Sequence, residues 1–242
     1  MALLVSVPVG TVPPSVVPWS SGNLDTIKAM LAANEAGKIN IADYWTIGDT
    51  REVYFANTVV GNSYALWVIT DMNGHTSGGT AYNAIIHTKN CFATSRYMNS
   101  SNTNAGGWNG CYARNTVMAE IYAGIVASFK SMIKTVDNVS GVGSQSDTIQ
   151  HTNDQIWMFT EQEVQGSRSY AGSAEAATCK HFDYFKIASN KVKTGNGGSP
   201  GYWWLRSPYI SYSADFCTVY AGGAAAGNYA SYLFGVVSAA AI

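Results

Sequence analysis

The chain has 242 residues, of which 47% are hydrophobic and only 12% are charged, and its formal net charge is −1. This length accommodates one large domain or two small ones with a sizeable core. The small net charge and the lack of a Lys/Arg cluster argue against a nucleic-acid partner. No apolar run approaches the roughly 18 residues that cross a bilayer, so we expect no membrane insertion.

The first part of the chain predicts an extended arm followed by a helix. Residues 1–22 form the expected arm, because their prolines fix φ and discourage helix at the preceding residues. Residues 23–242 form the expected single domain. Its first helix begins at the N-cap Asn23 and ends at Gly37.

The next segments are expected to be strands. YWTIGD, REVYFA and YALWVIT are short, aromatic and β-branched, and they lie between Asp43 and Thr70. Turn residues dominate 71–79, and AIIHT is a further strand candidate. We therefore expect short strands joined by glycine-containing turns.

The middle of the chain predicts helices. One apolar stripe steps by four residues through Val117, Ile121, Ile125, Phe129 and Ile133. Residues 139–154 are expected to be a loop or a ragged hairpin. Thr160 and Glu163 have capping-box spacing, and Ser173 is expected to open a helix that reaches Phe185. YWWLRSP, FCTVY and YLFGVV are the expected strands near the C-terminus.

The residues that could carry chemistry form no recognised catalytic or metal motif. The four cysteines are scattered with no CxxC pair, which favours buried free thiols. A single disulfide is the alternative. No HExxH, GxSxG or phosphate-binding glycine motif occurs. Glu161 and Glu163 lie only two residues apart, which is unsuitable for the paired carboxylates of a glycoside hydrolase. We therefore expect no catalytic residue, no metal and no cofactor, and an activity of binding rather than catalysis.

The C-terminal composition is typical of a binding surface. From Tyr209 onward, the segments between the strands consist mainly of Tyr, Ser, Ala, Gly, Asn and Asp. Antibody loops use a similar set, because Tyr offers a large rigid contact area and Ser, Gly and Asn adapt their hydrogen bonds. A plain polar, loop-rich terminus is the alternative interpretation.

Several segments resemble those of a domain family of gut phages and Firmicutes. IADYWTIGDTREV is similar to the opening of that domain, and YMNSSNTNAGGW followed by Arg114 is similar to its middle. The segments at 134–138 and 163–171 follow in the family's order. The resemblance is completed by WWLRSP, FCTV, Gly223, ASY and a final GV. It covers about residues 24 to 242.

The resemblance implies an α+β, C-type-lectin-like fold, related to the formylglycine-generating enzyme scaffold, with short strands, a few helices and long loops. Some members are variable proteins of diversity-generating retroelements, in which a fixed frame displays residues that change. It implies a candidate variable region over 203–242. The ligand-facing candidates in it are Tyr209, Ile210, Tyr212, Ser213, Tyr220, Gly222, Ala224, Ala226, Asn228, Tyr229, Tyr232 and Phe234.

Other residues of the region have expected structural roles. We expect Arg206 to be held by a carboxylate or by backbone carbonyls, because an unpaired buried guanidinium is costly. Gly223 and Gly235 are expected to supply backbone conformations closed to other residues. The chain ends GVVSAAAI, with Ser238 and Ala240 where the family has proline and an aromatic residue, so its last strand is expected to pack more loosely.

The sequence therefore predicts a ligand-binding domain of a phage tail or a bacterial surface protein, located on the virion or the cell surface. Its expected partner is a host cell-surface protein or glycan, with homo-oligomerisation, as a trimer, offsetting weak single sites. Two alternatives stay open. The chain could be a structural virion protein whose tail makes subunit contacts, or a polysaccharide depolymerase.

Overall fold

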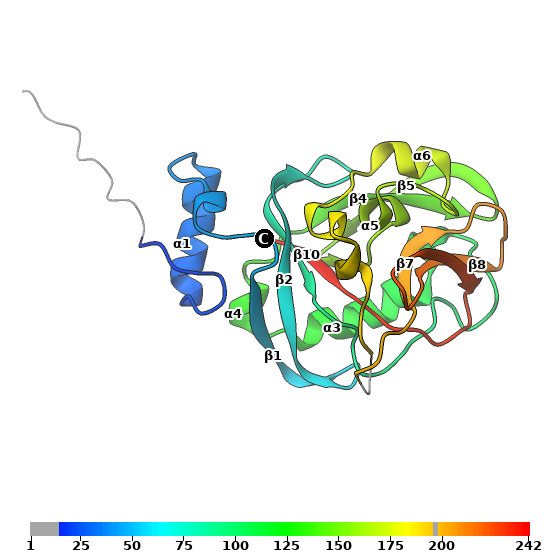
Figure 1. The fold of residues 1–242 in the computed structure, drawn as a ribbon, viewed down its shortest axis with the longest axis horizontal. Coiled ribbons are helices and arrows are strands. Elements are labelled where there is room, and N and C mark those ends of the chain that lie inside the picture. The colour runs from blue at the N-terminus through cyan, green and yellow to red at the C-terminus, as the bar shows by residue number, and fades with distance from the viewer. Residues whose placement is uncertain (1–14, 196–197) are drawn as a thin grey trace, which may run out of the picture.

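A computed structural model describes residues 15–195 and 198–242 (Figure 1). It combines helices and strands, which confirms the α+β class. The helices are α1 (Leu24–Glu35), α2 (Gly107–Gly110), α3 (Ala119–Gly124), α4 (Ala127–Lys130), α5 (Glu161–Gln165) and α6 (Ser173–Thr178), with a π-helix at Ala113–Met118 and 3-10 turns at Ile41–Asp43, Asp183–Lys186 and Ala188–Lys191. The strands are β1 (Thr50–Val59), β2 (Asn62–His75), β3 (Ala81–Thr88), β4 (Val136–Gly143), β5 (Ser146–Asp154), β6 (Ile156–Trp157), β7 (Trp203–Pro208), β8 (Asp215–Val219), β9 (Ala225–Tyr229) and β10 (Ala239–Ala241).

The strands form three sheets. The largest has the order β1-β2-β3-β10-β6, so the C-terminal strand lies between segments from the first half and the middle of the chain. β4 and β5 form a separate hairpin, which confirms the hairpin option for residues 139–154. β7, β8 and β9 form an antiparallel sheet at the opposite end of the molecule from α1 (Figure 1).

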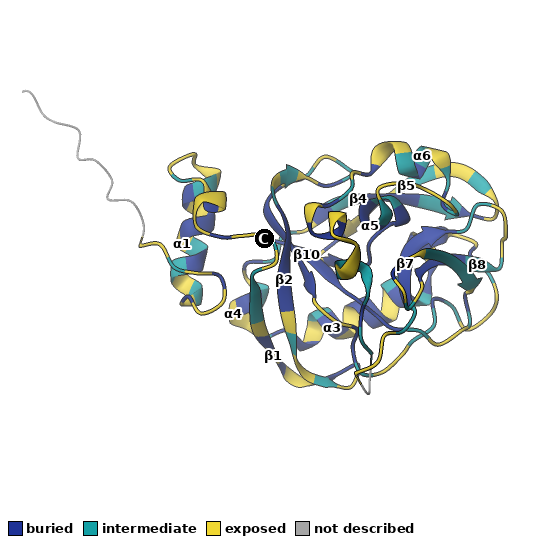
Figure 2. Cartoon of the chain, viewed as in Figure 1, coloured by how far each residue is buried: buried dark blue, intermediate teal, exposed yellow. Residues whose placement is uncertain are grey.

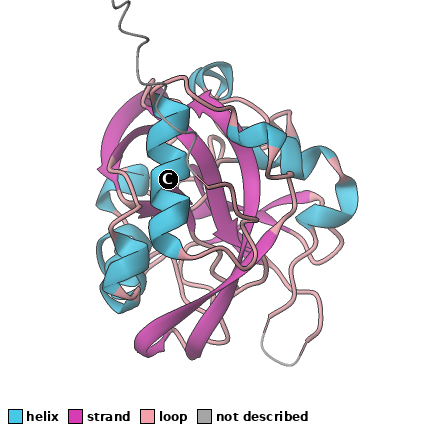
Figure 3. Ribbon diagram, turned by 90° about the vertical axis from the view of Figure 1, so that its left-hand side faces the viewer, coloured by secondary structure: helices cyan, strands magenta, loops and turns pink. Residues whose placement is uncertain are grey.

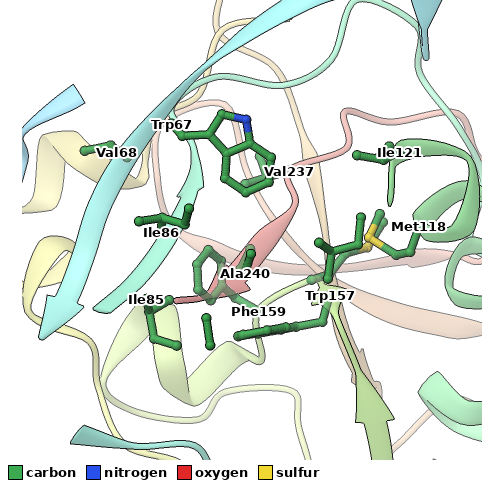
Figure 4. Close-up of a cluster of buried hydrophobic side chains, with 14 of the residues drawn as sticks. Trp67, Val68, Ile85, Ile86, Met118, Ile121, Trp157, Phe159, Val237 and Ala240 are labelled. Carbon is green, nitrogen blue, oxygen red and sulfur yellow. The ribbon is translucent and has the colours of Figure 1, made fainter. Parts of the chain in front are cut away.

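One hydrophobic core joins these parts. Figure 4 shows Trp67 and Ile86 of the large sheet facing Met118 and Ile121 of the helical segment, with Trp157 beside them. The buried cluster continues without interruption into β7 and β8. Its extent indicates that the described residues fold around a single core.

The N-terminal helix packs on the large sheet. Trp19, within the predicted arm, is fully buried and its ring lies 5.6 Å from that of Trp45 and 6.1 Å from that of Phe129. Figure 3, seen from this side, shows a helix lying in front of the strands. The described end of the arm is therefore part of the core, and residues 1–14 lie outside the described residues.

The local signals at helix ends are confirmed. The side chain of Asn23 accepts a hydrogen bond from the N–H of Asp25, and Gly37 follows α1 with φ +67°. Thr160 and Glu163 form both hydrogen bonds of a capping box at the start of α5. These contacts depend on neighbouring residues only, which is why a sequence pattern predicts them.

The single helix predicted along the stripe from Val117 to Ile133 is wrong. The chain forms a π-helix and then α3, leaves helical geometry at Ile125 (ψ 131°) and resumes as α4. Ile125 instead makes an antiparallel bridge to Phe55 of β1. A tertiary contact with the sheet edge thus interrupts a pattern that local spacing would continue.

Two other predicted elements are also wrong. The helix from Ser173 ends at Thr178, and Phe185 belongs to a separate 3-10 turn, because Glu175 and Phe185 are buried against different partners. The segment 44–49 is a turn rather than a strand, since the Asp49 carboxylate accepts a hydrogen bond from the N–H of Thr46.

The C-terminal strand lies elsewhere than predicted. Residues 232–237 make only isolated bridges, between Phe234 and Arg96 and between Gly235 and Trp203. The strand is β10, three alanines that pair with both β3 and β6 and are fully buried. The expected looser packing is therefore wrong, because this strand is paired on both edges and its three side chains are fully buried.

Candidate functional site

The frame of the candidate site is β7, whose residues Trp203–Pro208 are all buried. Arg206 lies at its centre and donates to both carboxylate oxygens of Glu163, at 2.8 and 2.7 Å. It also donates to the carbonyls of Met158 and Val139. These contacts confirm that Arg206 has a structural role, since the N–H groups of its guanidinium are all bonded to these acceptors.

The twelve predicted ligand-facing residues all lie on the outer part of the β7-β8-β9 sheet, and none is buried. They occupy the turn after β7, the turn between β8 and β9, β9 itself and the segment that follows it. The exposed ones are Tyr212, Ser213, Tyr220, Gly222, Ala224, Tyr229 and Tyr232; the half-buried ones are Tyr209, Ile210, Ala226, Asn228 and Phe234. Figure 2 shows the contrast between the buried β7 and the partly exposed segments beside it. We call this set the C-terminal face.

Aromatic rings of the C-terminal face form two contacting rows. In one, Tyr220, Tyr202, Phe234, Tyr232 and Tyr229 follow one another with ring centroids 4.9 to 5.9 Å apart. In the other, Tyr170, Tyr209 and Tyr212 are spaced by 5.0 and 5.1 Å. Neighbouring rings restrict one another's rotamers, so these contacts hold the side chains in place.

A buried amide holds the turn after β7. Asn104 is fully buried, and its Nδ2 lies 2.7 to 3.2 Å from the carbonyl oxygens of Tyr209, Tyr212 and Asp215. Its Oδ1 accepts from the N–H of Ser144, and its own N–H donates to the carbonyl of Ser213. One side chain therefore joins the turn of the face to the β4–β5 hairpin.

A buried carboxylate holds the neighbouring loop. Glu161 is fully buried and accepts hydrogen bonds from the N–H groups of Ser169, Tyr170 and Ala171. The carbonyl of Tyr170 in turn accepts from the N–H of Ile210. Glu161 thus places the ring of Tyr170 against the C-terminal face.

A second buried carboxylate lies directly beneath the face. Glu175 accepts from the N–H of Gly141 at 2.8 Å and hydrogen-bonds to Ser207 Oγ, and it lines a small enclosed cavity together with Tyr209 and Ile210. Burial raises the pKa of Glu175 to about 7, although Ser207, Gly141 and Arg206 partly oppose the shift. Its charge therefore changes close to neutral pH.

The two glycines have different reasons for being glycine. Gly223 has φ +92°, in the left-handed region, which confirms the prediction. Gly235 has no positive φ, so the prediction for it is wrong; a Cβ at this position would lie 2.4 Å from Cys91 Sγ. Close approach of two segments, rather than backbone conformation, requires glycine there.

Sequence reasoning did not find Asn104, Glu161 or Tyr170. Asn104 lies in the polar segment MNSSNTN, which has no periodic pattern, and the carbonyls that its Nδ2 bonds are more than a hundred residues away in the chain. Glu161 was weighed only as a catalytic carboxylate. A glutamate just inside a capping box, before a Gly/Ser loop, is the one local hint that it accepts backbone hydrogen bonds.

The carboxylates of the Glu161 and Glu163 pair, and that of Glu175, are occupied by partners within the protein. Glu161, Glu163 and Glu175 are all buried and hydrogen-bonded within the frame. The four cysteines are buried and free, which confirms the expected thiols. Among residues 15–195 and 198–242, no three His, Cys, Asp or Glu side chains are grouped to hold a metal ion. None of the helices described there combines the length and apolar character needed to cross a membrane.

The chain belongs to a domain family of unknown function, DUF6273, whose model matches residues 82–241. The match begins within β3 and includes every strand of the C-terminal face. No curated protein and no solved structure matches the chain. The match therefore defines a family without assigning it an activity.

Proposed function

We propose that this chain is a ligand-binding domain with a C-type-lectin-like fold, carried by a phage tail or a bacterial surface protein. The observation that supports this function is the separation of a buried frame from an exposed, neutral face. Trp203–Pro208 are buried throughout, whereas the twelve residues of the C-terminal face are not, and Asp215 is the only charged residue between positions 209 and 234.

This separation suits a binding surface whose residues change. Substituting an exposed side chain has little effect on folding, while the buried frame keeps the display geometry constant. A variable protein of a diversity-generating retroelement needs this property. The exposed tyrosines supply large contact area at low entropic cost, as in antibody loops.

The test compares two triple variants. Tyr212, Tyr229 and Tyr232 are replaced by Ala in one, and Tyr44, Tyr54 and Tyr64, which are similarly exposed but lie outside the face, in the other. Labelled protein is titrated onto a panel of Firmicutes cells. We expect the first variant to lose binding at least tenfold with a Tm within a few degrees of wild type, and the second to bind normally. Normal binding by the first variant would exclude this face.

Subunit contacts through the same tyrosines are the alternative. Exposed aromatic residues also suit an oligomer interface. Light scattering over a dilution series of wild type and of the Tyr212, Tyr229 and Tyr232 variant separates the two functions. A subunit interface at these tyrosines gives an oligomer that dissociates in the variant, whereas the proposed receptor-binding face leaves the oligomeric state unchanged.

A further inference from the structure

The outer edge of β9 has main-chain groups without partners. β9 is the last strand in the order β7-β8-β9, so only one of its edges belongs to the ladder. Antiparallel residues alternate between pairs that exchange both main-chain hydrogen bonds and pairs that exchange none. At the two ends of this ladder, the N–H of Ala230 donates to the carbonyl of Ala214, and the N–H of Tyr220 donates to the carbonyl of Ala224.

This alternation fixes which groups point outward. Ala226 and Asn228 fall on the hydrogen-bonded pairs, so the N–H and C=O groups of Ala225, Gly227 and Tyr229 point away from β8. Of these groups, only the C=O of Tyr229 is already used, by the N–H of Tyr232. Asp215, opposite Tyr229, agrees with this assignment, because both its N–H and its C=O are used on its other side, by Tyr212 and Tyr209. Among the described residues, the three outward N–H groups donate no hydrogen bond.

The edge also lacks the features that normally prevent strand pairing. Natural edge strands carry charged residues, prolines or bulges, since an open edge invites another strand. β9 has the sequence AAGNY, its register with β8 is continuous, and no residue of it is buried. The edge of β1, by contrast, carries Arg51 and Glu52 and is bridged at Phe55 by Ile125.

We propose that β9 is a docking edge, and that an extended segment of a partner protein adds to it as a fourth strand of the β7-β8-β9 sheet. This inference rests on the proposed function and specifies its ligand as a protein. The outward N–H and C=O groups recur at every second residue, a spacing that an extended peptide backbone matches along its whole length. A glycan has no matching line of alternating N–H donors and C=O acceptors.

The surroundings of β9 indicate the chemistry of the added segment. A Cβ at Gly227 would lie 2.5 Å from Cδ1 of Tyr209. The ring of Tyr209 therefore covers one face of β9, where it would contact the side chains of the added segment. The other face presents Ala226 and Asn228, whose Nδ2 donates to Thr218 Oγ1. Asp215, half-buried opposite Tyr229, is the one charged side chain of β8 and β9, so the segment is expected to be largely uncharged and rich in β-branched or aromatic residues.

The test uses linear nine-residue peptides selected from a display library on the wild-type protein. Ala225→Pro removes an outward N–H without removing a hydrogen bond to β8, and Ala225→Val adds apolar bulk at the same position while keeping the N–H. We expect peptide affinity to fall at least tenfold for Ala225→Pro and less than threefold for Ala225→Val. On the wild-type protein, methylating alternate peptide nitrogens should abolish binding in one register and spare it in the other.

Hydrogen exchange of single amides provides the second readout. In the free protein, Ala225, Gly227 and Tyr229 should exchange faster than Ala226 and Asn228, and a bound peptide should protect all three. Peptides that bind without this protection would overturn strand addition. So would binding to neutral glycans on a printed array but to no peptide, or concentration-dependent protection without peptide, which would identify a second copy of the chain as the occupant. If the tyrosine variant loses cell binding and Ala225→Pro does not, the C-terminal face remains the proposed ligand-binding surface, but strand addition to β9 is rejected.

Discussion

Single buried polar residues hold segments of the C-terminal face and its frame in position through hydrogen bonds. Glu161, Glu163 and Glu175 are three buried carboxylates with different partners, and one of them, Glu163, bonds the buried Arg206. Glu163 accepts hydrogen bonds from the guanidinium of Arg206, and Glu161 accepts them from three backbone N–H groups. Glu175 has only Ser207 and one N–H, so it is the carboxyl group least stabilised as an anion.

This imbalance predicts a pH-dependent stability. The pKa of Glu175 is about 7 in the folded chain against 4.5 for an ordinary glutamate, so its contribution is fully present below pH 4.5 and is lost as the pH rises through 7. The loss corresponds to about 3 kcal/mol. Urea unfolding between pH 4.5 and 8 should show wild type losing this stability relative to Glu175→Gln. Subtracting the two curves of stability against pH cancels the contributions of other titrating groups, such as the buried Lys193. A constant difference would contradict the prediction.

At the scale of elements, the turn after β7 depends on Asn104. Replacing it by Ala removes the side-chain donor shared by the carbonyls of Tyr209, Tyr212 and Asp215, and leaves the carbonyl of Tyr209 without this partner. We expect Asn104→Ala to lower the free energy of unfolding by about 2 kcal/mol. It should also increase backbone motion at 209–215 in NMR relaxation, whereas Asn102→Ala, which removes only an exposed contact to Ser231, should change neither. An unchanged turn in Asn104→Ala would show that other contacts hold it.

The sequence predicts elements whose signals are local. Helix caps, the β1–β2 hairpin and the buried β7 follow from neighbouring residues, whereas the positions of the twelve face residues were implied by the family resemblance. β9 and β10 were not predicted, because AAGNY and AAA have low strand propensity and become strands only through their position beside β8 and between β3 and β6. The break at Ile125 and the role of Asn104 depend on partners distant in sequence, which no local pattern contains.

At the scale of the molecule, the fold extends beyond the family match. The match starts at Tyr82, within β3, yet β3 pairs with β2 along most of its length. Trp19, Trp67 and Ile69, all upstream of the match, are fully buried in the shared core. The folding unit therefore includes residues upstream of the matched segment.

This extent predicts that the matched segment does not fold alone. A fragment of residues 80–242 exposes the edge of β3 and loses the tryptophans of the N-terminal part, so it should melt without cooperativity and bind a hydrophobic dye. Adding the complementary fragment, residues 1–79, should restore a cooperative transition, because the cut lies in the connection between β2 and β3. A fragment 80–242 that melts like the full chain would contradict a shared core.

The central claim, that the C-terminal face meets the ligand, is tested most directly by site-specific crosslinking. A photoreactive phenylalanine derivative replaces Tyr229 in one protein and the still more accessible Tyr54 in another, and each is irradiated on Firmicutes cells that bind the wild type. We predict a covalent adduct with a cell-surface component from position 229 and none from position 54. Adducts from position 54 alone would show that the ligand binds a different surface.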